Sequence, residues 1–333
     1  MKTEKQKIII QNIARAIKQS DKIVLFHHVR ADGDTVSCSY GLLKALQSKF
    51  PEKTIKWVAD QEYLSTNFGY LNIDFENAID GSEVDHSWTA IMGDSAVKAR
   101  IHGWEVYKKA GVKICFDHHN NDIDFEADFY WREPNYIASS LQAVQIQDEL
   151  GIKRNSRIAC LSLVGILTDS NFFKMSLNQQ LPLQIATELM KDIDRNDLQK
   201  IYTGMDQRTA TQVKTTAYAL QNYISKDQVA FIHWTDKLIN EYNTSADQIA
   251  DPEVIANIKD IGIWMAFTDY KDDNFTRLEI RSNGCPVDKI ATKFGGGGHT
   301  QAAGASLTYQ SQTMINDVVE EAIKQYQEYK KSS

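Results

Sequence analysis

Three short segments rich in aspartate and histidine directly follow apolar runs that are typical of buried strands. They are residues 28–34 (HVRADGD), 93–95 (GDS) and 117–119 (DHH), and a fourth acid, Asp169, ends an apolar helical stretch. In an open α/β sheet the carboxyl ends of parallel strands meet at one edge, where ligands bind. We therefore expect these side chains to converge.

Several carboxylates within a few ångströms repel one another and raise each other's pKa unless cations lie between them. Oxygen and imidazole ligands suit Mn²⁺, Fe²⁺, Co²⁺ or Zn²⁺, and the lack of cysteine in these segments argues against a structural zinc site. The ligands suffice for two ions, ~3.5–4 Å apart in such sites, with one carboxylate reaching both. Two ions of this kind stabilise a hydroxide nucleophile and neutralise charge on phosphoryl oxygens.

Each segment taken alone has a simpler explanation. Asp-Gly-Asp after a strand usually forms a turn whose acids cap the next helix. Asp94 and Asp169 could likewise be ordinary caps or surface acids, and the DHH triplet could be a solvated loop. The metal hypothesis depends on the recurrence of the pattern at strand ends within one domain.

A glycine run near the C-terminus is the second signal, and it comprises Gly295, Gly296, Gly297 and Gly298, followed by His299. Such a run costs conformational entropy, and we expect no packing in return. A nest of backbone amides favours anions, so the run and His299 are predicted to hold a phosphate. Arg281 is the cation expected nearby, and Arg100 is a weaker candidate. The glycine run could instead be a flexible hairpin tip. Arg281 could be a solvated charge on an edge strand, and Arg100 could be an ion-pair partner at the rim of the sheet.

The first part of the chain alternates between predicted strands and helices. Predicted strands are residues 22–28, 55–59, 89–92 and 112–116; predicted helices are residues 4–18, 35–46, 97–109 and 156–167, with helices dominating from 138 to about 223. This alternation predicts a doubly wound, mostly parallel sheet with helices on both faces.

The last part of the chain predicts a smaller α/β domain. Its predicted strands are residues 229–234, 262–268, 276–282 and 302–307, and its predicted helices are 287–293 and 315–329. We place the boundary between residues 192 and 211, and assign residues 1–190 to the first domain, 191–224 to a helical connector and 225–333 to the second. The active-site cleft is expected between the two domains.

Composition limits the partners of this 333-residue chain, whose 37 basic and 44 acidic residues leave a net charge of −7. That charge argues against a broad basic face that coats long duplexes. The longest nearly apolar run, residues 158–167, is too short to span a bilayer, so we expect no membrane association. Four scattered cysteines without a CxxC pair are typical of reduced thiols in the cytoplasm.

HVRADGD, GDS, DHH and TDS resemble, in that order, the four motifs of the DHH phosphoesterase superfamily. The segment IRSNGCPVDKIATKFGGGGHTQAAGASL is similar to the first type of DHH-associated C-terminal domain. The length and layout are most similar to the stand-alone oligoribonucleases (nanoRNases) that also dephosphorylate 3′-phosphoadenosine 5′-phosphate. Two positions depart from the pattern, because Ala31 replaces the usual proline and Asn171 a frequent glycine.

The resemblance also implies a role for each residue. It implies one ion on His28, Asp32 and Asp94, and a second on Asp34, Asp94, His118 and Asp169, with Asp94 bridging. Asp117 would hold the metal ligands in place without binding an ion itself. His119 would contact the scissile phosphate and help to protonate the leaving group. The glycine run and His299, with Arg281 and Ser282, would hold the phosphate and nucleotide farther from the cut.

The implied function is Mn²⁺-dependent hydrolysis of very short RNA, roughly two to five nucleotides long, to 5′-mononucleotides. Dephosphorylation of 3′-phosphoadenosine 5′-phosphate and cleavage of linear di-adenylate (pApA) are further implied activities. A DHH inorganic pyrophosphatase is one alternative, although its Ser-Arg-Lys-Lys segment does not occur here. A catalytically silent nucleotide-binding regulatory module is another, although it would not need the full ligand set. Cleavage polarity and oligomeric state, a homodimer included, stay open.

Overall fold

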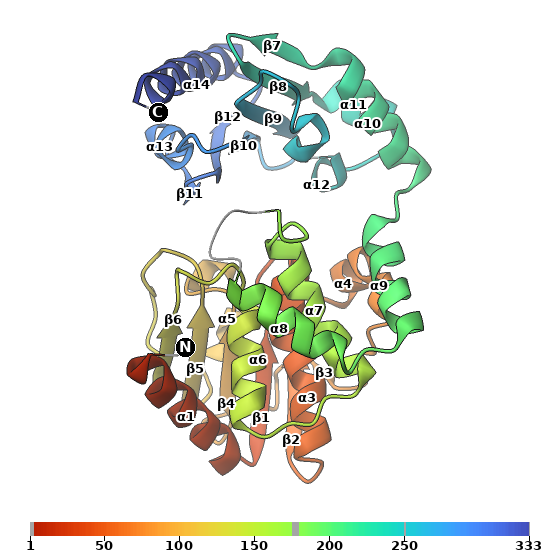
Figure 1. Cartoon of the computed structure of the whole chain (residues 1–333), viewed down its shortest axis with the longest axis vertical. Coiled ribbons are helices and arrows are strands. Elements are labelled where there is room, and N and C mark those ends of the chain that lie inside the picture. Colours follow the sequence, from red (N-terminus) through yellow and green to blue (C-terminus); the bar gives the residue numbers. More distant parts are fainter. Residues whose placement is uncertain (1–2, 175–179, 250, 333) are drawn as a thin grey trace. The chain divides into compact units, whose positions relative to one another are not determined.

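The computed structural model describes residues 3–174, 180–249 and 251–332. The chain divides into two compact units, Met1–Asp206 and Gln207–Ser333, each shown in Figure 1. The division lies within the interval 192–211, and the helices of the expected connector belong to different units. No helix in the described part of the chain has the length and apolar character needed to cross a membrane. All four cysteines are buried and unpaired.

The first unit is built on a parallel sheet with the strand order β3-β2-β1-β4-β5-β6. Its strands are β1 (Lys22–Phe26), β2 (Thr54–Val58), β3 (Ala78–Ile79), β4 (Thr89–Gly93), β5 (Val112–Asp117) and β6 (Phe129–Arg132). Every pairing between them is parallel. The strands β3 and β6 are not among those predicted from the sequence, although the aromatic run in β6 fits strand propensity. The three strands that carry the predicted site, β1, β4 and β5, are direct neighbours.

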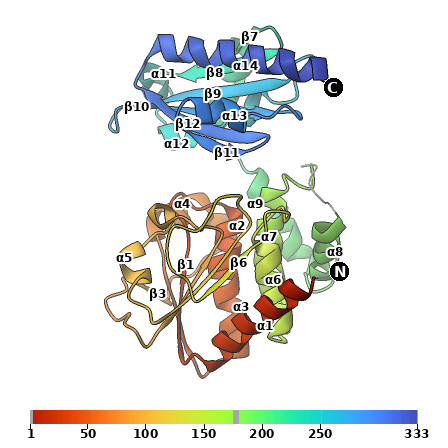
Figure 2. The same ribbon diagram turned by 90° about the vertical axis from the view of Figure 1, so that its left-hand side faces the viewer.

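Helices cover the two faces of this sheet unequally, as Figure 2 shows. The α-helices are α1 (Glu4–Gln19), α2 (Gly33–Val36), α3 (Leu42–Lys49), α4 (Gln61–Asn67), α5 (Trp104–Tyr107), α6 (Ser140–Glu149), α7 (Ser156–Asp169), α8 (Gln180–Met190) and α9 (Arg195–Asp206). Ile23 and Leu25 of β1 pack in the large core under α1, α3, α6 and α7, whereas Val24 and Phe26 face a smaller core with α5. The predicted parallel α/β fold is confirmed.

The predicted helix over residues 97–109 is wrong. The chain instead forms a 3₁₀ turn, Lys98–Arg100, and then the short helix α5. Gly103 adopts a left-handed conformation, with φ of 77°, that ends regular helix geometry. Between the two turns, Ile101 forms an antiparallel bridge with His28, so this segment extends along the end of β1 instead of coiling.

The helix predicted over residues 35–46 begins slightly earlier and is not uniform. It starts at Gly33 in α2, passes through a π-helical turn at Ser37–Gly41 and continues as α3. Asp32 caps its first turn, because its carboxylate accepts hydrogen bonds from the N–H groups of Asp34 and Thr35. The cap fixes the backbone conformation at the point where the first acidic segment turns away from β1.

The second unit has a mixed sheet with the strand order β11-β12-β10-β9-β8-β7. The strands are β7 (Ile224–Lys226), β8 (Val229–Trp234), β9 (Ile263–Tyr270), β10 (Phe275–Ser282), β11 (Gly297–His299) and β12 (Ala302–Thr308). Only β8 and β9 pair in parallel among these described strands. The helices are α10 (Ala210–Asn222), α11 (Asp236–Glu241), α12 (Ala246–Ile249), α13 (Asp288–Lys293) and α14 (Gln312–Ser332).

Candidate metal centre

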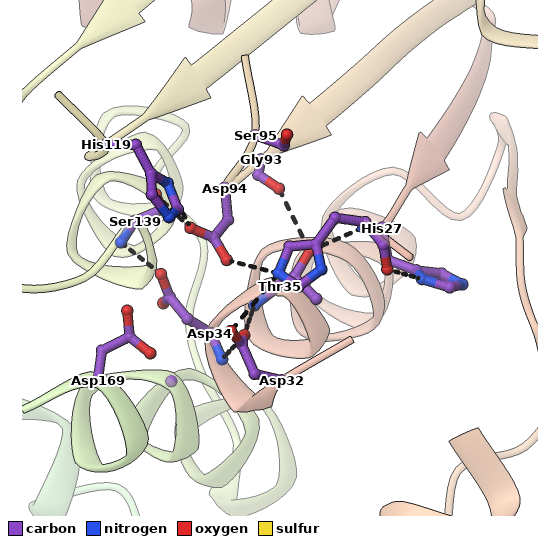
Figure 3. Close-up of polar contacts among 12 residues, drawn as sticks. His27, Asp32, Asp34, Thr35, Gly93, Asp94, Ser95, His119, Ser139 and Asp169 are labelled. Atoms are coloured by element: carbon purple, nitrogen blue, oxygen red, sulfur yellow. Dashed lines mark hydrogen bonds and ion pairs between the residues drawn. The ribbon is translucent and has the colours of Figure 1, made fainter. Parts of the chain in front are cut away.

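The predicted residues meet at the carboxyl edge of the first sheet, where β1, β4 and β5 end side by side (Figure 3). The strands contribute through the residues that follow them, and two helices contribute the rest. The converging side chains are His28 after β1, Asp32 and Asp34 at the start of α2, Asp94 after β4, Asp117, His118 and His119 around the end of β5, and Asp169 at the end of α7. The predicted convergence is confirmed.

Asp94 lies between two histidines from different segments. Its Oδ2 is 3.3 Å from Nε2 of His28, and its Oδ1 is 3.5 Å from Nε2 of His118. The same nitrogen of His28 is 3.5 Å from Oδ2 of Asp32, and that of His118 is 3.3 Å from Oδ2 of Asp169. Asp94 is thus the residue best placed to belong to two sets of metal ligands, one with His28 and one with His118.

Three groups of side chains place their ligand atoms within 4.8 Å of one another. The groups are His28 with Asp32 and Asp94, Asp34 with His118 and Asp169, and Asp94 with His118 and His119. The first group is the set that the resemblance implies for one ion, and the second contains three of the four residues implied for the other. His119 is the one member that was not expected to be a ligand.

The hydrogen bonds of His28 and His118 fit a metal centre. Nδ1 of His28 is 2.9 Å from the carbonyl oxygen of Val29, and Nδ1 of His118 is 3.2 Å from that of Tyr136. A carbonyl only accepts, so each Nδ1 carries a proton, and a ring without a second proton turns the lone pair of Nε2 toward carboxylates. Lone pairs facing carboxylates are unfavourable without a cation, and Nδ1–H donated to a carbonyl is the usual arrangement of a metal-bound histidine.

Nε2 of His28 is buried and has no hydrogen-bond partner of good geometry within the described ranges. A proton or a cation is therefore needed between this nitrogen and the nearby carboxylates. Without a cation, the ring is protonated. Burial lowers its pKa, but the nearby carboxylates of Asp32 and Asp94 outweigh burial and raise the pKa to about 10. The donor set therefore fits a divalent ion, which would replace this proton.

Asp34 lies at the N-terminus of α6, where two backbone N–H groups donate to its carboxylate. The Ser139 amide nitrogen is 2.6 Å from Oδ2, and the Ser140 amide nitrogen is 2.8 Å from Oδ1. The side chain of Ser139 forms no cap of its own, so Asp34 takes the place of the helix cap. Neither serine could be recognised from the sequence, because a Ser-Ser pair at a helix start looks like an ordinary cap.

Three carboxyl groups of the site, those of Asp34, Asp169 and Asp32, have pKa values shifted from the ordinary range. Burial raises the pKa of Asp34 well above its usual value, and the charges of Asp94 and Asp32 raise it further. Burial and the charges of Asp34, Asp32 and Asp94 raise the pKa of Asp169 in the same way. Asp32, whose side chain is 53% exposed, instead has a lowered pKa. Partial loss of solvent raises this pKa, but His28 and the N–H of Thr35 stabilise the charged form and outweigh that effect. A cation beside Asp34 and Asp169 would let both of them ionise at neutral pH.

His119 is held by Asp117, because its Nδ1 lies 2.7 Å from Oδ1 of that acid. Burial opposes protonation of His119, but the hydrogen bond to Asp117 and the charge of Asp94 raise its pKa above the usual value. The same contact, against the effect of burial, lowers the pKa of Asp117. Arg100 is exposed at the same edge, and its charge contributes to the lowered pKa of Asp32.

In the second unit, β-sheet register brings two of the predicted substrate residues to one face. Arg281 of β10 and His299 of β11 both pair with Ala302 of β12, the strand between them. Directly opposed residues point to the same face, and strands lie about 4.8 Å apart, so the two side chains start roughly 10 Å apart. Arg281 is 28% exposed, with Nε 3.7 Å from a carboxylate oxygen of Glu253.

The expectation that the glycine run gives no packing in return is wrong. Gly296 and Gly298 lie against β12, where a Cβ would fall 2.0 Å from the Gly304 oxygen and 2.5 Å from the Ala302 oxygen. The run is also not simply a loop, since its second half forms β11. Gly295 and Gly297 have nothing within 4 Å of a Cβ, so open space remains at these two positions.

Ser282 is a structural residue in this unit. Its side chain is buried on the opposite face from Arg281, and its hydroxyl donates to the carbonyl oxygen of Cys285. The hydroxyl is therefore engaged within this unit, and the implied contact of Ser282 with a nucleotide stays a prediction. Arg281 and His299 are the side chains in this set that face outward.

Comparison with known families covers most of the chain. Residues 22–166 match the DHH family, N-terminal domain, and residues 230–329 match the DHHA1 domain. The crystal structure of an exopolyphosphatase-related protein from Bacteroides fragilis matches 96% of each chain with a TM-score of 0.79 at 23% identity. At that level of identity, the similarity shows the shared fold alone.

Two relatives carry the same name, "Bifunctional oligoribonuclease and PAP phosphatase NrnA". The protein of Mycoplasma genitalium is 34% identical to this chain, over 95% of this chain and 97% of its own length. That of Bacillus subtilis is 27% identical, over 89% of this chain and 92% of its own length. The similarity to both relatives extends through both units.

Divalent ions should stabilise the protein more at about pH 8.5 than at about pH 6.5. Without ions, the stability that protonated His28 contributes is lost as pH rises from 6.5 toward 10, and Asp34 and Asp169, with raised pKa values, change stability in the same direction. Ions bind deprotonated ligands and so gain affinity with pH. At 100 times its Kd, Mn²⁺ should add about 2.7 kcal/mol to the free energy of unfolding, a Tm shift of several degrees by calorimetry.

A pair of histidine variants provides the control. His28→Gln should remove most of the pH dependence of the Mn²⁺ effect, whereas His86→Gln, at an exposed position, should leave it unchanged. A Tm shift that is equal at the two pH values, or larger at the lower one, would contradict the assignment of these residues as ligands.

Proposed function

This chain belongs to the DHH family, and on that premise we propose that it is a two-metal phosphoesterase that hydrolyses very short RNA to 5′-mononucleotides. Dephosphorylation of 3′-phosphoadenosine 5′-phosphate and cleavage of pApA are further proposed activities. The observation that carries the proposal is the pair of ligand groups that adjoin at Asp94. The printed names of the relatives, which join an oligoribonuclease to a PAP phosphatase, support the choice of substrates. Four buried, unpaired thiols support a cytoplasmic location.

Two Mn²⁺ ions are the proposed cofactors, because mixed carboxylate and imidazole ligands suit this ion. We assign one ion to His28, Asp32 and Asp94, and the second to Asp34, Asp94, His118 and Asp169. When bound, two such ions lower the pKa of water and neutralise charge that develops on phosphoryl oxygens. The backbone contacts of both histidines hold their rings so that Nε2 faces the carboxylates.

His119 is the proposed general acid. Its Nδ1–H is held by Asp117, so Nε2 is the nitrogen that delivers a proton to the leaving oxygen. The raised pKa of His119 favours the protonated ring near neutral pH, which this role requires. Asp117 acts on the reaction only through the orientation and charge of His119. Arg100, exposed at the same edge, is a proposed contact for a substrate phosphate.

The second unit is the proposed substrate-binding part. Arg281 and His299 would hold one phosphate on the shared face of the sheet, and the open space at Gly295 and Gly297 would let that phosphate approach the backbone closely. We propose that one phosphate of the substrate occupies this grip while the scissile phosphate lies at the metal centre, a fixed number of nucleotides away. A substrate would then have to span that distance, which favours very short RNA.

Replacing Asp94 with alanine should lower kcat/KM by at least ~10³-fold, because both ions lose a ligand. Hydrolysis of a dinucleotide with Mn²⁺ measures the effect, and circular dichroism verifies the fold. The matched control is Asp85→Ala, which removes an exposed turn residue and should keep full activity. Turnover of Asp94→Ala close to that of wild type would refute the two-metal assignment.

Length selectivity tests the role of the second unit. With Mn²⁺ present, a dinucleotide should be hydrolysed far faster than a twenty-nucleotide RNA, because the long chain cannot place its end phosphate in the grip and its scissile phosphate at the metals together. A panel of dinucleotide, 3′-phosphoadenosine 5′-phosphate, pApA and pyrophosphate then identifies the preferred substrate. Equal rates for both RNA lengths would contradict the fixed grip, and preference for pyrophosphate would favour the inorganic pyrophosphatase alternative.

His299→Ala should raise KM for the dinucleotide and leave kcat nearly unchanged, because the contact holds the ground state and the transition state alike. Steady-state kinetics measures both constants. Thr300→Ala changes the neighbouring exposed residue and is the control, with an unchanged KM expected. An unchanged KM for His299→Ala would remove this histidine from the proposed binding site.

A further inference from the structure

Ser139 is fully buried at the point where α6 begins, and it contacts three of the proposed metal ligands. Its amide N–H donates to Asp34, as described above. Its hydroxyl oxygen lies 3.2 Å from the amide nitrogen of His118 and 3.3 Å from Oδ1 of Asp94. Figure 3 shows Ser139 beside Asp34 and Asp94.

The direction of these hydrogen bonds follows from the chemistry of each partner. The His118 amide can only donate, so the hydroxyl oxygen accepts from it. The single hydroxyl proton is then available to Asp94, whose ionised carboxylate can only accept. The hydroxyl therefore links the backbone of His118, directly after β5, to the carboxylate of Asp94, directly after β4.

Among the described residues, this hydroxyl forms no hydrogen bond besides these two. A serine at the start of a helix usually caps the first turn, but no such bond forms here, and Asp34 satisfies the helix N–H groups instead. Meanwhile Oδ1 of Asp94 is the oxygen nearest to His118, and Oδ2 is the one nearest to His28. A donor to Oδ1 limits rotation of the carboxylate, which would otherwise exchange these two directions.

We propose that the Ser139 hydroxyl is a positioning group that holds Asp94 in the orientation needed to bridge two divalent ions. The inference rests on the two-metal centre of the proposed function. Because hydrogen bonds from surrounding residues orient metal ligands, losing one typically lowers metal affinity roughly 10- to 100-fold. Ser139 touches neither substrate nor the reacting atoms in this assignment, so it acts through Asp94 and His118.

The test is isothermal titration of chelator-treated protein with Mn²⁺ alone. Wild type should bind two ions, and Ser139→Ala should bind at least one of them roughly 10-fold or more weakly. Ser39→Ala is the matched control, because Ser39 is equally buried but its hydroxyl donates only to the carbonyl oxygen of Thr35, and binding of both ions should be preserved. The spin coupling between two Mn²⁺ ions, measured by electron paramagnetic resonance, should weaken in Ser139→Ala only.

Ser139→Thr keeps the hydroxyl and separates hydrogen bonding from loss of packing, and it also decides the matter if the alanine variant fails to fold. Two-ion binding in Ser139→Thr, with loss in Ser139→Ala, supports the proposal. Equal losses in both variants, or wild-type affinity in Ser139→Ala, overturn it while leaving the metal centre in place. Wild-type protein that binds no Mn²⁺ overturns both the positioning role and the proposed function, so the two failures are distinguishable.

Discussion

Repulsion among buried carboxylates is the constraint on which the active region of this protein depends. Asp34 and Asp94 are buried and Asp169 beside them is partly buried, and the pKa values of Asp34 and Asp169 are raised because loss of solvent and neighbouring charge disfavour ionisation. The fold offsets part of this cost with donors, namely the first N–H groups of α6 at Asp34 and the Ser139 hydroxyl at Asp94. Donors alone leave a net negative charge, which two divalent ions would neutralise.

The topology explains how acids so distant in sequence come together. Parallel strands β1, β4 and β5 are neighbours, so the residues that follow them arrive at one edge without any long connection. Asp169 comes from a helix instead, and it needs α7 to pass close to α2. Gly165 permits this approach, since a Cβ there would lie 2.8 Å from Oδ1 of Asp34. The ligands are thus placed by backbone packing, and side-chain flexibility contributes little.

The sequence predicted the convergence of the acidic and histidine segments better than it predicted the elements around them. Ligand types and strand-end positions are local features, so His28, Asp94 and His118 could be named from pattern alone, and their convergence followed from the rule for parallel sheets. Ser139 could not be found in this way, because its role depends on contacts with residues 21 and 45 positions distant in the chain. The helix predicted over residues 97–109 failed for the same reason, since the pairing of Ile101 with His28 is a tertiary contact.

The proposed metal ligands and the proposed phosphate-binding residues lie in opposite environments, and this difference bears on selectivity. Most of the proposed ligands are buried, where charges interact strongly, whereas His299 is exposed and Arg281 is partly exposed, so water weakens each of their contacts. Strand register nevertheless fixes their spacing, which gives a small, geometrically defined grip. A chain with a net charge of −7 offers no broad attraction to the rest of a long RNA. Extra nucleotides would therefore add repulsion without adding contacts, and a short substrate gains the most from this arrangement.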